Sequence, residues 1–101
     1  MRSDEFYVYI MTNKYHGTLY TGFTDDIFRR AKEHKEKVYS KSFTARYNLD
    51  KLVFYTSFQT ADEAYDYQKK LKRWKRKFNI ELIEEVNKEW RDLFDDFIEE
   101  D

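Results

Sequence analysis

Two short stretches near the start of the chain have the composition and alternation of β-strands. Residues 6–11 (FYVYIM) and 18–23 (TLYTGF) are rich in aromatic and β-branched side chains, and turn-forming residues separate them. The pattern predicts a β-hairpin with a loop of about six residues. Because side chains alternate between the two faces of a strand, a symmetric hairpin would place Tyr9 opposite Tyr20 on the same face.

A helix is predicted directly after the hairpin. Thr24 supplies a capping hydroxyl, and two aspartates follow it in the first turn, where negative charge is favoured. The helix is expected over residues 27–37. Its 3.6-residue period brings Arg30 and His34 to one face together with apolar neighbours, which is an unusual composition for a side that packs on a core.

The middle of the chain predicts a loop, a strand and a long helix. Residues 37–50 give mixed signals and are expected to form a loop with a short helix at 44–47, whereas residues 52–58 (LVFYTSF) predict a third strand. Thr60 then caps a helix, with Glu63 in the capping-box position. Apolar residues spaced three and four apart predict a core-facing ridge on this helix, formed by Ala64, Tyr67, Leu71, Trp74 and Phe78.

The C-terminal part of the chain predicts further amphipathic structure that ends in acidic residues. Residues 80–86 (IELIEEV) lead to Asn87, and residues 89–101 predict a final helix. We expect a single domain over residues 1–95, followed by an acidic tail over residues 96–101.

The composition limits the classes of protein to consider. A chain of 101 residues is long enough for one hydrophobic core, and 20% of it is aromatic, which excludes a disordered protein. It has no cysteine, hence no disulfide framework, and no apolar run long enough to cross a bilayer. We expect a soluble, cytoplasmic protein that does not contact a membrane.

Charge is distributed unevenly along the chain. Residues 1–80 hold 17 Lys or Arg against 10 Asp or Glu, whereas residues 81–101 hold 2 against 10. A basic body of this kind suits the phosphate backbone of a nucleic acid, although a solvated helix face would give the same pattern. The residues expected to contact nucleic acid are Arg29, Lys69, Lys72, Arg73, Lys75 and Arg76.

The order of these segments resembles that of a known family. Residues 7–9 (YVY) and 20–22 (YTG) resemble the two signature triplets of the GIY-YIG nuclease superfamily, and Arg30 and His34 follow on the next helix as they do there. The resemblance spans residues 6–94 and is strongest to small stand-alone bacterial members related to the amino-terminal domain of an excinuclease. It implies an α+β fold in which helices flank a three-stranded antiparallel sheet.

The resemblance also implies hydrolysis of phosphodiester bonds in DNA. By position, Tyr9 would help to activate the attacking water and Tyr20 would assist it. Arg30 would hold the scissile phosphate, and His34 would relay a proton or bind the phosphate. A phenol has a pKa of about 10, so a base role for Tyr9 calls for a nearby cation, and the planar fork of arginine suits phosphate oxygens.

Each of these residues also has a purely structural interpretation. The two tyrosines could form an ordinary cross-strand aromatic contact. Arg30 could extend from the edge of its helix into solvent, and His34 could be a packing residue with satisfied hydrogen bonds. The joint spacing of the four residues is what favours a catalytic site.

One position departs from the family. Active members place a metal-binding glutamate on the helix after the third strand, and the matching position, six residues before Trp74, is Gln68. An amide offers Mg²⁺ or Mn²⁺ a neutral oxygen and no charge to offset dehydration. Asp66 and Glu63 point elsewhere around the helix, so a replacement acid would have to come from the start of the first helix or from the acidic tail.

Two functions from different classes follow. The first is a DNA endonuclease with a weakened or displaced site for Mg²⁺ or Mn²⁺. The second is a nucleic-acid-binding module that keeps the fold and the Tyr/Arg/His site but has lost turnover. DNA is the expected partner in both cases, and no small-molecule cofactor is expected. The supporting asparagine of the family corresponds to either Asn79 or Asn87.

Overall fold

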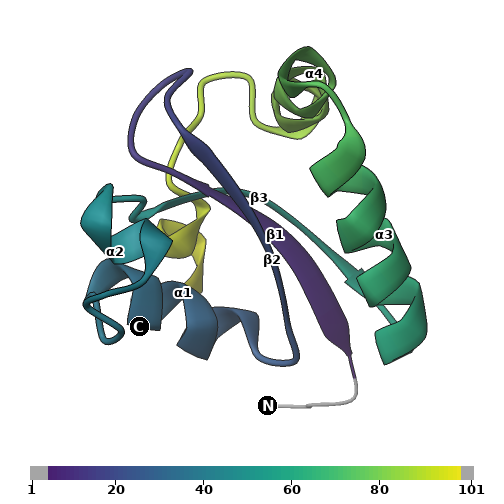
Figure 1. Ribbon diagram of the computed structural model, residues 1–101, viewed down its shortest axis with the longest axis horizontal. Coiled ribbons are helices and arrows are strands. Elements are labelled where there is room, and N and C mark those ends of the chain that lie inside the picture. The colour runs from purple at the N-terminus through teal and green to yellow at the C-terminus, as the bar shows by residue number, and fades with distance from the viewer. Residues whose placement is uncertain (1–4, 99–101) are drawn as a thin grey trace.

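The sheet of the protein is built around its first strand. In the computed structural model, which describes residues 5–98, β1 (Phe6–Thr12) lies between β2 (Leu19–Thr24) and β3 (Lys51–Phe58), and both pairings are antiparallel. The three strands cross the middle of the molecule, with helices on either side of them (Figure 1). The predicted fold class, a three-stranded antiparallel sheet flanked by helices, is confirmed.

One face of the sheet is covered by α3 (Ala61–Arg73) and α4 (Arg76–Val86). Val8 and Ile10 of β1 are fully buried in the hydrophobic cluster on this side, together with Leu71 of α3. Thr60 caps α3 as predicted, because its side chain accepts a hydrogen bond from the backbone N–H three residues later. This half of the core orients α3 along the sheet.

The opposite face is covered by α1 (Ile27–Lys35) and by a 3-10 helix, η1 (Leu93–Phe97), and α2 (Phe43–Arg46) lies beside α1. Tyr9 and Met11 of β1 point to this side, where they are buried in a second hydrophobic cluster. The alternation along β1 therefore divides the core into two clusters, one on each side of the sheet.

The predicted hairpin is present, with residues 13–18 as its loop, but its register differs from the predicted one. Tyr9 pairs with Gly22, and Tyr20 pairs with Met11. The prediction that the two tyrosines face each other directly was therefore wrong. The shift amounts to two residues, so both rings still lie on one face, and the missing side chain of Gly22 leaves the space that the ring of Tyr9 fills.

The ridge predicted for α3 ends early. The helix stops at Arg73, and Trp74 has an extended backbone (φ −67°, ψ 148°) before α4 begins. Asn79 helps to end the helix, because its Nδ2 donates to the C=O of Leu71 at 3.1 Å and satisfies a carbonyl that a longer helix would bond itself. Phe78 consequently lies in α4 and is 44% exposed.

Other boundaries differ in detail. Asp26, not Thr24, is the N-cap of α1, and the helix ends two residues before its predicted end. The predicted C-terminal helix is only the short 3-10 helix η1, and the predicted domain boundary at residue 95 falls inside it. Residues 99–101 of the predicted acidic tail lie outside the described residues.

No helix within residues 5–98 is both long enough and apolar enough to cross a membrane. The cytoplasmic location expected from the sequence stays a prediction.

Asn87 connects the end of α4 to the sheet and to the C-terminal segment. Its Nδ2 donates to the C=O of Val53 at 3.0 Å and to that of Arg91 at 2.8 Å, and its Oδ1 accepts from the N–H of Arg91 at 3.0 Å. The side chain is buried, so these bonds are formed away from water. Asn87 therefore has a structural role on the side of β3.

Replacing Asn87 with alanine should lower the free energy of unfolding by about 2–4 kcal/mol, because buried carbonyls of two segments lose their donor. Urea denaturation measures this change. Lys88→Ala, an exposed neighbour, should change the value by less than about 0.5 kcal/mol. Equal stability of Asn87→Ala and the natural chain would contradict this role.

Candidate active site

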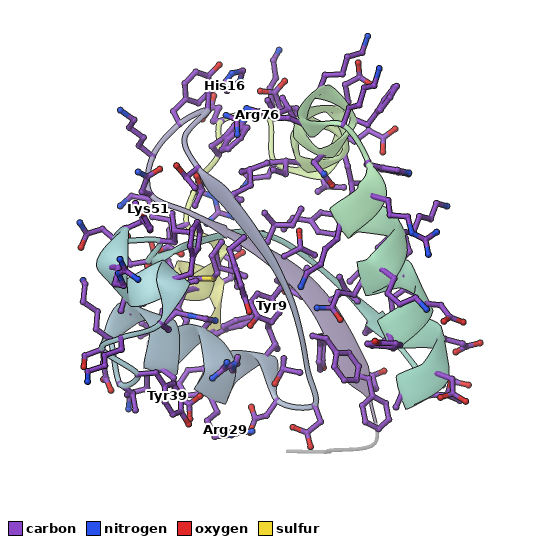
Figure 2. The ribbon with its side chains drawn as sticks, in the orientation of Figure 1. Tyr9, His16, Arg29, Tyr39, Lys51 and Arg76 are labelled. Carbon is purple, nitrogen blue, oxygen red and sulfur yellow. The ribbon has the colours of Figure 1, made fainter. Side chains whose placement is uncertain are left out.

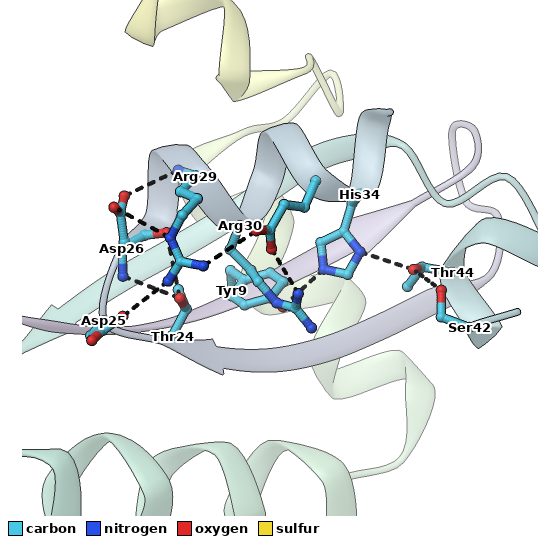
Figure 3. A network of polar contacts seen from close by, with 10 residues as sticks. Tyr9, Thr24, Asp25, Asp26, Arg29, Arg30, His34, Ser42 and Thr44 are labelled. Atoms are coloured by element: carbon cyan, nitrogen blue, oxygen red, sulfur yellow. Dashed lines mark hydrogen bonds and ion pairs between the residues drawn. The ribbon is translucent and has the colours of Figure 1, made fainter. Parts of the chain in front are cut away.

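The four residues predicted to be catalytic come together on the α1 side of the sheet. Oη of Tyr9 lies 2.9 Å from Nε2 of His34, and both side chains are buried. The ring of Tyr20 has its centroid 6.4 Å from that of Tyr9 and 5.7 Å from that of His34. Arg30 lies one turn before His34 on α1, and Figure 3 shows Tyr9, Arg30 and His34 converging below this helix.

A chain of hydrogen bonds runs from Tyr9 through His34 to the start of α2. Nδ1 of His34 lies 2.9 Å from Oγ1 of Thr44, which lies 3.2 Å from Oγ of Ser42 (Figure 3). Burial, and after it the positive charge of Arg30, lowers the pKa of His34 to about 4, so the ring is neutral at pH 7.

The direction of each hydrogen bond depends on which of the two atoms carries a proton. Arg30 lies beside Tyr9 and carries only donors, so it can approach the phenol only at the lone pairs of its oxygen. We therefore assign the phenol O–H of Tyr9 as the donor to Nε2 of His34. In a neutral ring the other nitrogen carries the proton, so we assign Nδ1–H as the donor to Thr44.

Tyr9 remains a phenol in the free protein. Burial raises its pKa above the ordinary value of 10, and the neighbouring Tyr20 acts in the same direction, whereas Arg30 lowers the pKa. The expectation that Arg30 would favour the phenolate was therefore right in direction, but burial outweighs it. Tyr9 can accept a proton only if its own proton moves to His34 at the same time.

Arg30 is held in place and faces a cavity. Its Nη1 donates to Oε1 of Glu33 at 2.9 Å. Burial alone would lower the pKa of Arg30, but the bond to Glu33 and the contact with Tyr9 raise it, so the guanidinium stays charged. Together with Tyr20 and His34, Arg30 lines a cavity of about 260 Å³, which gives an anion access to three of the four site residues.

The basic residues predicted to contact nucleic acid do not form one surface. Arg29 lies 3.3–3.6 Å from carboxylate oxygens of Asp25, Asp26 and Glu33, so its charge is largely compensated. Arg76 donates to the backbone C=O of His16 at 2.7 Å. Figure 2 shows Arg29 and Arg76 at opposite ends of the molecule. Lys69, Arg73 and Lys75 are exposed.

Lys72 is the basic residue of α3 that reaches the site from the other face of the sheet. Its Nζ lies 5.9 Å from the ring centroid of Tyr20. Both residues line a groove of about 470 Å³ at the edge of β2, to which Arg76 and Asn79 also contribute. Of the two asparagines that could match the supporting asparagine of the family, Asn79 is therefore the one beside Tyr20.

The residues around Gln68 do not fit a tightly held divalent cation. Gln68 is half-buried and lies one turn before Lys72, on the same side of α3. Within residues 5–98, no group of three or more His, Asp or Glu side chains is placed to hold a metal ion. The ammonium group of Lys72 would in addition repel Mg²⁺ or Mn²⁺ at this point.

Sequence reasoning missed two residues that build the site, Glu33 and Thr44, and the steric role of a third, Gly22. Glu33 orients Arg30, and the i, i+3 spacing of the two on one helix was a signal that could have revealed it. Gly22 makes room for Tyr9, but this became visible only with the observed register. Thr44 binds His34 across a loop, and no sequence pattern predicts that contact.

The profile of the GIY-YIG catalytic domain matches residues 5–81, so the chain belongs to this family. The match includes all four predicted catalytic residues and Gln68. Searches among curated proteins and among solved structures gave no match. The sequence-based recognition is confirmed for the family, and the closer relation to the amino-terminal domain of an excinuclease stays a prediction. The family supports a nuclease-like function.

Gly22→Ala should destabilise the protein by about 1–3 kcal/mol, because the added Cβ would overlap the ring and hydroxyl of Tyr9. Urea denaturation measures the loss. In a Tyr9→Ala background the same substitution should cost much less, since the overlapping atoms are gone. An equal cost in both backgrounds would show that Gly22 does not act through Tyr9.

Stability should also fall as the pH is lowered from about 6.5 to 4. The pKa of His34 is about 4 in the folded protein and near 6.5 in an unfolded chain, so over this range only the unfolded state takes up the proton. The free energy of unfolding should drop by up to about 3 kcal/mol, measured by urea denaturation at several pH values. In His34→Gln this component should disappear, and parallel profiles for both proteins would contradict it.

Proposed function

We propose that the protein binds DNA and hydrolyses its phosphodiester bonds slowly, with Tyr9, His34 and Arg30 as the reacting groups. The observation that supports this most is the buried hydrogen bond of 2.9 Å between Tyr9 and His34 beside the guanidinium of Arg30. A neutral proton acceptor, His34, and a phosphate-binding cation, Arg30, line one cavity, and the hydrogen bond to His34 holds the proton donor Tyr9 next to them.

The proposed reaction begins with a DNA phosphate paired with Arg30 in the cavity. A water oxygen forms a bond to phosphorus while the bond to the leaving oxygen breaks. The water gives a proton to the oxygen of Tyr9 as the phenol proton moves to Nε2 of His34, and the leaving oxygen takes a proton from solvent. Tyr20 assists by lining the same cavity.

Phosphate binding would strengthen His34 as a base. In the free protein burial, and after it the charge of Arg30, lowers the pKa of His34. A phosphate paired with Arg30 compensates that charge and raises the pKa of His34 towards its ordinary value. The proton relay is therefore better matched to neutral pH when the substrate is in place.

Turnover is proposed to be slow because of Gln68. A divalent cation contributes to such hydrolysis by stabilising charge on the phosphate, and its loss costs several kcal/mol of the barrier, equal to several orders of magnitude in rate. Gln68 supplies no charge for such an ion, and Lys72 opposes it. The fit of this site to Mg²⁺ or Mn²⁺ is correspondingly poor.

The second candidate is a DNA-binding module without turnover. The observation that favours it is the same pair, Gln68 and Lys72, which replaces a cation-binding position with an amide and a fixed positive charge. Such a module would use Arg30 and the basic residues of α3 to hold the phosphate backbone. Comparing DNA binding with DNA cleavage separates the two candidates.

Cleavage of duplex, single-stranded and branched DNA should be measured with Mg²⁺ or Mn²⁺. We expect slow cleavage by the natural chain, a loss of roughly 10²- to 10⁴-fold in Tyr9→Phe, and a gain of about tenfold or more in Gln68→Glu. Gln59→Glu, which adds the same charge at an exposed position, should change little.

Each outcome points to a different conclusion. Equal rates for Tyr9→Phe and the natural chain would rule out the proposed chemistry. Tight, salt-dependent DNA binding without cleavage by the natural chain would favour the binding module. Absence of DNA binding would overturn both.

A further inference from the structure

The segment between α1 and β3 exposes aromatic side chains next to the site. Tyr39, Phe43 and Tyr47 are 55%, 47% and 50% exposed. The rings of Phe43 and Tyr47 pack on each other with centroids 4.8 Å apart, and about half of each residue is still exposed. Three large exposed rings within nine residues are unusual for a surface loop, because each leaves apolar area in contact with water.

Two of these rings form a wall of the catalytic cavity. The cavity of about 260 Å³ that contains Tyr20, Arg30 and His34 is bordered on its other side by Tyr39 and Phe43. The guanidinium of Arg30 lies 5.4 Å from the ring centroid of Tyr39. A group bound against these rings would therefore lie next to the phosphate that Arg30 is proposed to hold.

The same segment is basic. Its charged residues between positions 37 and 49 are Lys37, Lys41 and Arg46, and there is no acid among them. All three are exposed, and none of them forms an ion pair within the described part of the chain. Aromatic and positively charged residues that alternate in this way suit a polyanion that also presents flat rings.

We propose that Tyr39 and Phe43 stack an unpaired base of the DNA strand that is bound at Arg30, so that the preferred substrate contains a single-stranded segment next to the bond to be cut. This inference rests on the proposed function, because it takes the phosphate position from Arg30. A base inside a duplex has both faces covered by its neighbours, so only an unpaired or extruded base offers a face to these rings.

The contact would also connect base binding to the proton relay. Phe43 is followed in α2 by Thr44, which holds His34 through Nδ1. A base seated against Phe43 would therefore lie one residue away from the group that holds the ring of His34. Bases of every type have a stacking face, so the site recognises unpaired structure and not a particular sequence.

Binding to fluorescent oligonucleotides tests the inference without relying on cleavage. We expect tighter binding to a duplex with a single-stranded overhang than to a blunt duplex with the same number of phosphates. Tyr39→Leu and Phe43→Leu, which keep apolar bulk but lose the ring, should each weaken overhang binding by roughly 5- to 100-fold and blunt-duplex binding by less than about twofold.

A base analogue and a matched variant make the test specific. A 2-aminopurine placed in the overhang should lose fluorescence on binding to the natural chain, and much less on binding to Phe43→Leu. Tyr15→Leu is the control, because Tyr15 is 63% exposed but lies beside His16, at the far end of the molecule from Tyr39 (Figure 2). This variant should behave like the natural chain.

Equal affinity for overhang and blunt DNA, or equal losses in Tyr15→Leu and Phe43→Leu, would overturn the stacking site alone. DNA binding and Tyr9-dependent cleavage would remain intact in that case. Failure of every oligonucleotide to bind would instead overturn the proposed function, and the stacking site with it.

Discussion

The hydroxyl group of Tyr9 lies in the middle of the molecule, and much of the site follows from the need to give it hydrogen-bond partners. A buried hydroxyl without a partner costs about 1–3 kcal/mol. His34 meets this need, with Arg30 beside the same hydroxyl, and both residues come from the face of α1 that packs on the sheet. The polar composition of that face, which is unusual for a core contact, thus has a structural cause as well as a chemical use. Thr44 then satisfies the second nitrogen of His34.

The sequence predicted those features that depend on local patterns. Alternating aromatic residues indicated the hairpin, a six-residue loop was expected and is found at residues 13–18, and Thr60 caps α3 as the capping rule predicts. The four site residues come together because hairpin and helix periodicity place them on one side, and periodicity can be read from a chain. The family profile confirms the recognition on which their roles were based.

Features that depend on contacts between distant residues could not be predicted in this way. The register of the hairpin follows from the fit of the Tyr9 ring over Gly22, and the end of α3 from the bond between Asn79 and Leu71. The protonation of Tyr9 depends on the balance between burial and the charge of Arg30, and this balance has no sequence signature. Gln68 was singled out by its position in the chain, whereas the ammonium of Lys72 near Tyr20 was visible only in the structure.

The break between α3 and α4 changes what the cluster of cations presents to a polymer. Lys69, Lys70, Lys72 and Arg73 lie on α3, whereas Lys75, Arg76 and Lys77 lie at or after the break, and α4 turns away from α3 (Figure 1). The positive charges therefore lie on two helices that meet at an angle near Trp74 and Lys75. Double-stranded DNA has a persistence length of about 150 base pairs, so bending it to follow both helices costs free energy, whereas a flexible single strand can follow both at little cost.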